Sequence, residues 1–185
     1  MTTIAIKGGI MAADSQATIS TEEGGSNRTL CEKIYRVGND IIGLAGESAP
    51  GLVFLDWYIQ TMTAPTLIAP EMLVHGEADF TALVLKHQGS AFEYDKWCRP
   101  ERVIDYDVKK CYAIGSGRKV AMGAMLAGKS AKDAVEIACS EDAHSGKPVV
   151  TMSFPKPPRP RRAKMKNGKP AETAPSDQGP SLPGG

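Results

Sequence analysis

The sequence lacks the residue spacing of a metal or redox site. Its four cysteines, Cys31, Cys98, Cys111 and Cys139, form neither a C-x-x-C pair nor a cluster with histidine. A phosphate-binding glycine loop and a dinucleotide-binding fingerprint are also missing. These absences predict a chain with no cofactor and no bound metal, so any dependence on ATP would lie in a separate partner protein.

Long apolar runs are missing as well. No run approaches the roughly 20 residues that are needed to cross a bilayer. The N-terminal residues also lack the basic and apolar segments of a signal peptide. We therefore expect a cytoplasmic protein that has no membrane partner.

The net charge of +1 conceals two segments of opposite sign. Residues 155–185 carry seven Lys or Arg against two acidic residues, a net charge of +5, which leaves −4 for residues 1–154. Eight of the last 31 residues are proline and no apolar periodicity is present there, so we expect a disordered basic tail. Residues 1–154 have the length of a single domain.

The tail favours one class of partner over another. Its composition would attract acidic groups by charge alone, which leaves the binding of acidic partners open as a secondary role. It contains no aromatic residues that could stack on bases, which argues against nucleic acid as the partner.

Alternating apolar residues bounded by turn residues predict short strands. Turns at Gly8-Gly9, Gly38-Asn39-Asp40 and Gln88-Gly89 would join three pairs of them as hairpins. Residues 21–29 have the composition of a polar loop, and residues 64–79 and 96–110 give no assignment. The predicted strands cover residues 2–7, 10–14, 33–37, 41–45, 80–86, 90–94, 111–114 and 148–154.

Three helices are predicted between these strands. The first, residues 48–62, starts with Ser48 as a cap and has an apolar face formed by Leu52, Leu55, Ile59 and Met62, widened by Trp57 and Tyr58. The second, residues 119–127, ends at Gly128, and the third begins at Ser130 with Asp133 in a capping box. Its apolar face is formed by Ala131, Ala134, Val135 and Ala138. This order predicts an α+β fold with antiparallel sheets between outer helices.

Thr2 is a candidate nucleophile. A threonine hydroxyl needs an adjacent base, and a free α-amine on the same residue can supply it, because the ordinary pKa of such an amine, about 7.7 to 8.0, is close to neutral pH. This arrangement requires that Thr2 become the first residue, and an initiator Met before a small residue is usually removed. By itself, a Thr at this position is more often an ordinary strand start.

Several segments keep the order of a known family. They resemble the first strands and the later loops of proteasome β subunits and of HslV, their bacterial relative. The matching segments are Thr2-Thr3-Ile4-Ala5-Ile6-Lys7, Met11 to Thr18, Glu32-Lys33-Ile34, Gly43-Leu44-Ala45-Gly46, Ala113-Ile114-Gly115-Ser116-Gly117 and Glu141-Asp142-Ala143-His144-Ser145-Gly146. The resemblance implies an N-terminal-nucleophile (Ntn) hydrolase fold, a four-layer αββα sandwich, over residues 1–154.

The resemblance also implies catalytic roles in a threonine-type endopeptidase. Thr2 would attack the scissile carbonyl, and Lys33, held by Asp14, would lower the pKa of its amine and hydroxyl. The backbone N–H of Gly46 would stabilise the oxyanion. Taken singly, Asp14 is more often a turn residue and Lys33 a solvated lysine, while Gly46 is also a strand-to-helix turn, a role compatible with the first.

Three more residues match the cluster that orients the terminal amine in this family: Ser116, Asp142 and Ser145. Their ordinary interpretations are loop or cap residues for the serines and a helix-end charge for Asp142. His144 lies beside them and invites a catalytic-triad interpretation, but a single His in a polar loop is more often exposed to solvent.

The family resemblance places a substrate pocket around the lysine and the oxyanion glycine. Here the pocket residues would be Cys31, Tyr35, Leu44 and Ser48, joined by Leu52. They predict an uncharged, partly apolar pocket, in which Cys31 is a lining residue rather than a nucleophile.

The expected partners are peptide or unfolded-protein substrates, further copies of the chain in a homo-oligomeric ring, and a separate ATP-dependent unfoldase. A catalytically silent shell protein with the same fold is the alternative. The joint presence of Thr2, Asp14, Lys33 and Gly46 argues against it, because an inert copy has no physical need of all four.

Overall fold

Tight glycine turns fold the start of the chain back on itself. The computed structural model describes residues 2–20, 26–70, 79–105 and 110–155. Gly8 and Gly9 have φ values of 62° and 74° and join β1 (Thr3–Lys7) to β2 (Ile10–Asp14) in the two-residue turn that suits strand twist. β10 (Cys111–Gly115) and β11 (Val149–Ser153) pair with the outer edges of this hairpin. The result is an antiparallel sheet of order β10-β1-β2-β11.

A second antiparallel sheet has the order β5-β6-β7-β8-β9. Its strands are β5 (Ile34–Val37), β6 (Asp40–Gly46), β7 (Phe80–Lys86), β8 (Ala91–Tyr94) and β9 (Pro100–Ile104). The three predicted hairpins are confirmed. β9 falls in the segment 96–110, for which no element is predicted from residue pattern.

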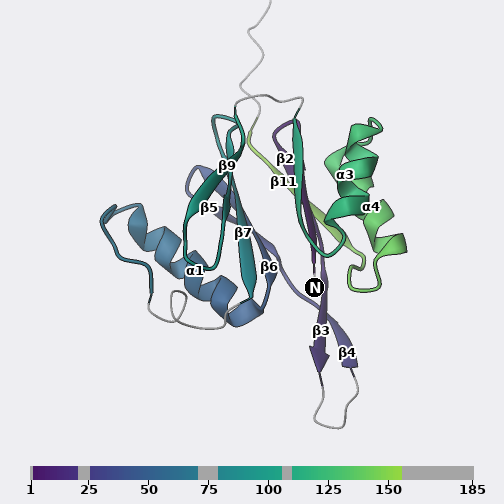
Figure 1. Ribbon diagram of the computed structural model, residues 1–185, viewed down its shortest axis with the longest axis horizontal. Coiled ribbons are helices and arrows are strands. Elements are labelled where there is room, and N and C mark those ends of the chain that lie inside the picture. The colour runs from purple at the N-terminus through teal and green to yellow at the C-terminus, as the bar shows by residue number, and fades with distance from the viewer. Residues whose placement is uncertain (1, 21–25, 71–78, 106–109, 156–185) are drawn as a thin grey trace, which may run out of the picture. The chain divides into compact units, whose positions relative to one another are not determined.

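Helices cover the outer face of each sheet, so the described unit has four layers (Figure 1). α1 (Ser48–Thr61) packs on the five-stranded sheet, while α3 (Arg118–Leu126) and α4 (Ala131–Glu141) pack on the four-stranded one. Ile4, Ile6 and Met11 of one sheet meet Ile41 and Leu83 of the other in the apolar layer between the sheets. The expected αββα arrangement is therefore confirmed.

The outer layers differ in their packing residues. Small side chains dominate beneath α3 and α4, where Ala5, Ala12 and Ala113 meet Ala134 and Ala138. Aromatic residues dominate beneath α1, where the Phe54 ring lies 5.6 Å from Phe80 and 5.2 Å from Tyr94 between ring centroids. Small residues let α3 and α4 lie close to the sheet, whereas large aromatic side chains fill the space between α1 and its sheet.

The apolar face predicted for α1 is only partly correct, because of the residues named for it only Tyr58 is buried. Leu52, Ile59 and Met62 are 51%, 46% and 47% exposed, whereas Phe54 and Tyr58 are buried. Both sets have helical spacing, and the aromatic set removes more apolar surface from water when it faces the sheet. The predicted Ser48 cap is also wrong, because Glu47 holds the N-cap position and makes no side-chain capping bond.

The ends of α3 and α4 are as predicted. Gly128 has a φ of 97° and donates its N–H to Met125 O, while the N–H of Lys129 bonds to Ala124 O, which is the Schellman arrangement. At the start of α4, the Ser130 hydroxyl accepts the N–H of Asp133 at 3.1 Å, as a capping box requires.

A two-stranded ribbon extends from the body of the unit (Figure 1). It consists of β3 (Gln16–Ser20) and β4 (Ser26–Leu30), and every residue of β4 is exposed. The polar loop predicted for residues 21–29 is thus partly a strand. Residues 21–25, like most of the predicted tail 155–185, lie outside the described residues.

None of the helices in the described ranges is long and apolar enough to cross a membrane.

The close contact between the two sheets can be tested at Gly43. A Cβ at this position would lie 2.9 Å from Ile4 Cγ2 and 3.0 Å from Met11 Sδ. We expect Gly43→Ala to lower the free energy of unfolding by about 1–3 kcal/mol through overpacking. Gly123→Ala is the control, because the site on α3 is open, and it should stabilise by about 0.5–1 kcal/mol. Equal effects of the two substitutions in urea denaturation would contradict this packing.

Candidate active site

A buried ion pair lies where the two sheets meet. Lys33 Nζ lies 2.9 Å from Asp14 Oδ1 and 3.0 Å from Oδ2, and the two residues are only 6% and 1% exposed. Asp14 is the last residue of β2, and Lys33 directly precedes β5. The pair therefore joins the four-stranded sheet to the five-stranded one.

Backbone groups complete the surroundings of this pair. The carboxylate of Asp14 accepts the N–H groups of Thr3 (2.8 Å), Gln16 (3.1 Å) and Gly146 (3.0 Å), and Lys33 Nζ donates to Gln16 O at 2.6 Å. A buried carboxylate is tolerated when a counter-charge and several N–H donors replace its water. Both charged groups are thereby fixed in position.

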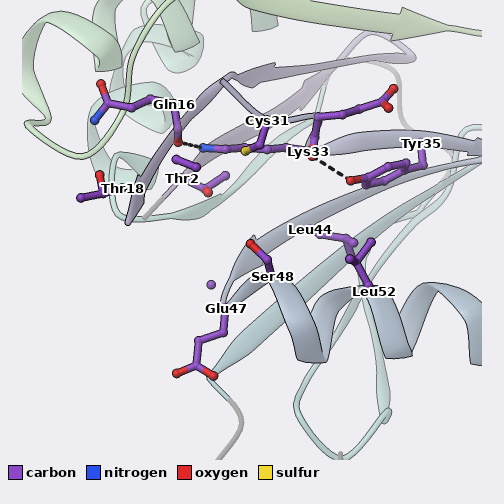
Figure 2. Close-up of a pocket in the computed structure, with 13 residues that line it drawn as sticks. Thr2, Gln16, Thr18, Cys31, Lys33, Tyr35, Leu44, Glu47, Ser48 and Leu52 are labelled. Atoms are coloured by element: carbon purple, nitrogen blue, oxygen red, sulfur yellow. Dashed lines mark hydrogen bonds between the residues drawn. The ribbon is translucent and has the colours of Figure 1, made fainter. Parts of the chain in front are cut away.

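Thr2 and Lys33 line a common cavity of about 250 Å³ (Figure 2). Thr2 is 4% exposed and directly precedes β1. The cavity wall is formed by β3, by the segment from Cys31 to Tyr35, by the end of β6 and by the first turns of α1. Its lining residues are Thr2, Gln16, Ala17, Thr18, Cys31, Glu32, Lys33, Tyr35, Leu44, Gly46, Glu47, Ser48 and Leu52.

The predicted pocket residues all belong to this lining. Burial raises the pKa of the Cys31 thiol, although Lys33 opposes the shift. Burial and then the nearby Glu32 raise the pKa of Tyr35, whose hydroxyl donates to Glu32 O at 2.7 Å. Both side chains are therefore neutral at physiological pH.

The prediction of an uncharged pocket missed two acidic residues, Glu32 and Glu47, which also line the cavity and are exposed. Figure 2 shows the Glu47 side chain directed away from Thr2. Leu44 and Leu52 contribute apolar surface beside these carboxylates, so the lining is partly apolar, as predicted.

Gly46 lines the cavity at the end of β6. Its φ is 101°, and a Cβ there would collide with the backbone of Asp79 and Phe80. Only glycine fits this position without strain. Its role in the turn into α1 is therefore structural whatever else its backbone does.

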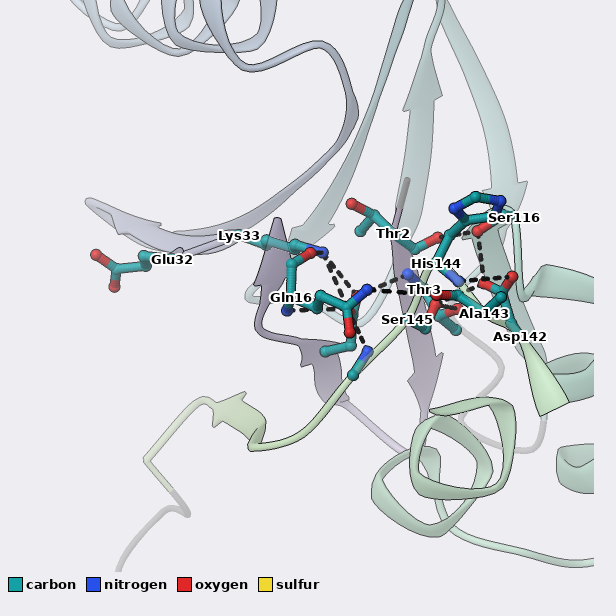
Figure 3. Close-up of polar contacts among 12 residues, drawn as sticks. Thr2, Thr3, Gln16, Glu32, Lys33, Ser116, Asp142, Ala143, His144 and Ser145 are labelled. Atoms are coloured by element: carbon teal, nitrogen blue, oxygen red, sulfur yellow. Dashed lines mark hydrogen bonds and ion pairs between the residues drawn. The ribbon is translucent and has the colours of Figure 1, made fainter. Parts of the chain in front are cut away.

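A second polar cluster adjoins Thr2 on the side away from Lys33 (Figure 3). Ser116 Oγ donates to Asp142 Oδ2 at 2.6 Å, and Ser145 Oγ donates to the same oxygen at 2.7 Å. Ser116 Oγ also lies 3.5 Å from Thr2 O. Each serine gives its single hydroxyl proton to Asp142, so each serine oxygen is left as an acceptor.

Asp142 remains ionised in this cluster. Burial alone would raise its pKa, but hydrogen bonds from Ser116 and Ser145 and from the N–H of His144 lower it below the ordinary value. His144 itself is exposed, as predicted, and contributes this backbone bond at 3.3 Å.

The fold thus gathers the predicted residues into two adjoining groups. Thr2, Lys33 and Gly46 line the cavity with the pocket residues, and Asp14 holds Lys33 from behind. Ser116, Asp142 and Ser145 form the second group. Within the described ranges, no set of three or more His, Cys, Asp or Glu residues is arranged to hold a metal ion.

Sequence reasoning missed three residues that build the site. Gln16 contributes its carbonyl and N–H, Gly146 contributes its N–H, and Thr3 contributes both its N–H and its hydroxyl. Backbone groups carry no residue-type signal. Thr3 lies within the matching first strand, where nothing in its residue type separates it from an ordinary strand residue.

Solved structures with the same fold have been found. Eukaryotic HslV from Trypanosoma brucei matches with a TM-score of 0.60 and 18% sequence identity, over 82% of this chain and 99% of that one. BPH from Thiobacillus denitrificans matches with a TM-score of 0.56 and 20% identity, over 85% of this chain and 98% of that one. The chain therefore has the fold of HslV and of BPH.

The structure of Thiobacillus denitrificans BPH in complex with epoxomicin also matches this fold, with a TM-score of 0.56 and 20% identity, over 83% of this chain and 97% of that one. No protein-family model and no curated protein matches the sequence. The likeness therefore lies in the three-dimensional fold, where it extends over nearly the full length of the HslV and BPH chains.

The contribution of the Asp14–Lys33 pair to the free energy of unfolding can be measured. We expect Asp14→Ala to lower the free energy of unfolding by about 3–5 kcal/mol, because buried Lys33 loses its counter-charge and three N–H groups lose their acceptor. The exposed pair Arg102–Asp105, at 3.3 Å, gives the control: Asp105→Ala should cost less than about 1 kcal/mol. Similar losses for the two variants in chemical denaturation would contradict the assigned role of Asp14.

Proposed function

We propose that this chain is a threonine-type endopeptidase in which removal of Met1 makes Thr2 the first residue. One observation carries the proposal: Thr2 and Lys33, 31 residues apart in the sequence, line the same cavity together with Gly46. A hydroxyl and a buried ammonium group in one cavity, together with a glycine backbone, suit acyl transfer by a covalent intermediate.

In the proposed reaction, Thr2 Oγ attacks the scissile carbonyl carbon. Its proton passes to the α-amine of Thr2, directly or through a water molecule, and the carbonyl oxygen becomes an oxyanion that the N–H of Gly46 stabilises. Collapse of this intermediate breaks the C–N bond, and the leaving amine takes the proton. Water then hydrolyses the Thr2 ester by the same steps and releases the second product.

Lys33 tunes the nucleophile in this proposal. Its positive charge disfavours a second cation nearby, so it lowers the pKa of the Thr2 amine and keeps it unprotonated near neutral pH. Asp14 holds the ammonium group in place. The strength of this effect follows from burial, because the pair is almost completely removed from water.

Ser116, Asp142 and Ser145 orient the amine in this proposal. Both serines donate to the ionised Asp142, and their oxygens are free to accept a proton from an amine at Thr2. The short distance of 3.5 Å between Ser116 Oγ and Thr2 O supports a position of this serine beside the terminal residue.

We further propose a homo-oligomeric ring in the cytoplasm that receives unfolded protein from a separate ATP-dependent unfoldase. The resemblance to proteasome β subunits and the HslV fold support both elements. A secondary role of the basic tail in binding acidic partners rests on its composition alone.

The alternative function is a catalytically silent shell protein. It would keep the fold without a free α-amine on Thr2. Intact-mass measurement separates the two proposals, because a retained Met1 blocks the amine and favours the silent shell.

The apolar part of the cavity lining, formed by Leu44 and Leu52, predicts cleavage after apolar residues. On a panel of fluorogenic peptides that differ only at the residue before the scissile bond, we expect the highest kcat/KM for Leu, Phe or Tyr. Glu47→Gln is the matched control and should leave the order unchanged, because its side chain leaves the cavity. A preference for acidic or basic residues would refute the prediction.

The nucleophile itself can be identified chemically. A peptide epoxyketone has two electrophilic centres and so tests for a hydroxyl and an amine on one residue. We expect its adduct on the peptide that begins with Thr2. Thr2→Ala should lose the adduct and all turnover without unfolding, whereas Thr2→Ser, which keeps both groups, should retain the adduct.

Lys33→Ala should reduce turnover by at least about 100-fold. Wild-type activity in Thr2→Ala or in Lys33→Ala would overturn the mechanism. An adduct on Cys31, which lines the same cavity, would identify a different nucleophile.

A further inference from the structure

Thr3 makes polar contacts toward both groups of the site. Its backbone N–H donates to Asp14 Oδ1 at 2.8 Å, and its hydroxyl lies 2.6 Å from Ser145 Oγ. The residue is fully buried, with 0% exposure. One residue therefore touches the ion pair through its backbone and the serine cluster through its side chain.

Proton counting fixes the direction of the second bond. The hydroxyl proton of Ser145 is already donated to the ionised Asp142 at 2.7 Å, so Ser145 can only accept from Thr3. The hydrogen bonds form a chain from Thr3 to Ser145 to Asp142, with Ser116 donating from the other end. Bonds in such a chain polarise one another, because each donor is made more acidic by the bond that it accepts.

The surrounding backbone leaves Thr3 little freedom. A Cβ at Gly117 would collide with Thr3 Oγ1, so the hydroxyl lies directly against the backbone at the start of α3. On β10, which pairs with β1, a Cβ at Gly115 would collide with Thr2 O. The peptide group between Thr2 and Thr3 therefore lies against Gly115, Asp14 and Ser116, while Gly117 confines the Thr3 hydroxyl.

We propose that Thr3 is a positioning residue for Thr2. It acts by fixing the Thr2–Thr3 peptide plane between Asp14 and the chain of hydroxyl groups that ends at Asp142. This assignment rests on the proposed peptidase function, and it adds a residue that does not itself reach the cavity. The Thr3 N–H belongs to the same peptide group as Thr2 O, so holding one sets the direction of the other.

Two substitutions separate positioning from packing. Thr3→Val keeps the shape and removes the hydroxyl, and we expect kcat to fall about tenfold while KM stays within about twofold, as a misaligned nucleophile with unchanged substrate binding predicts. Thr3→Ser keeps the hydroxyl and removes a methyl group, so it should lower the melting temperature but keep kcat within about twofold of wild type. Thr151→Val, on β11 of the same sheet, is the control and should change neither.

A double-mutant cycle tests the path through Ser145. If Thr3 acts through this serine, adding Thr3→Val to Ser145→Ala should lower kcat by less than about twofold further. Multiplication of the two single effects would overturn the proposed path. A Thr3→Val enzyme with wild-type kcat, or a Thr3→Ser enzyme as slow as Thr3→Val, would overturn the positioning role.

The epoxyketone reaction distinguishes a failure of the proposed peptidase function from a failure of the proposed role of Thr3. Wild-type protein with neither turnover nor an adduct on Thr2 would overturn the peptidase function, and the role of Thr3 would fall with it. An active wild type alongside an equally active Thr3→Val would overturn the role of Thr3 alone. The expected result is a slower rate of adduct formation on Thr2 in Thr3→Val, with the site of the adduct unchanged.

Discussion

The carboxylate of Asp14 is the group on which the rest of the site depends. It binds the ammonium group of Lys33 and the N–H groups of Thr3, Gln16 and Gly146. These partners come from the first strand, the start of the ribbon, the segment before β5 and the loop before β11. A single buried charge thus brings together four segments that are distant in sequence, and its own burial is tolerated only because all of them contribute.

The two halves of the site use different physical means. On the Lys33 side, an ion pair excluded from water provides a strong local field. On the Asp142 side, an ionised carboxylate orders hydroxyl groups so that their oxygens face the start of the chain. Thr2 lies between them and is attached to Thr3, which has bonds to both. Thr2 is therefore adjacent both to the charge of Lys33 and to the hydroxyl groups ordered by Asp142, although these come from separate groups of residues.

The sequence predicted what its residue types determine directly. Glycine turns, alternating strands and the capped ends of α3 and α4 are local, and they were found. Asp14, Lys33 and Asp142 were identifiable because charged residues stood at the positions of a family pattern. The face of α1 was predicted only in part: Tyr58 is buried as expected, but Leu52 and Ile59, which have equivalent helical spacing, are exposed and Phe54 is buried instead. The contributions of Gln16 and Gly146 were missed, because they use backbone N–H and C=O groups, which every residue type except proline has in common.

The cavity is enclosed by parts of both sheets. Thr2 enters it from the four-stranded sheet, while Leu44 and Gly46 belong to the five-stranded one. Neither sheet alone can form it, and the Asp14–Lys33 pair exists only after the two have docked. An unfolded chain, or one in which only one sheet has formed, therefore lacks both the cavity and the charge beside Thr2.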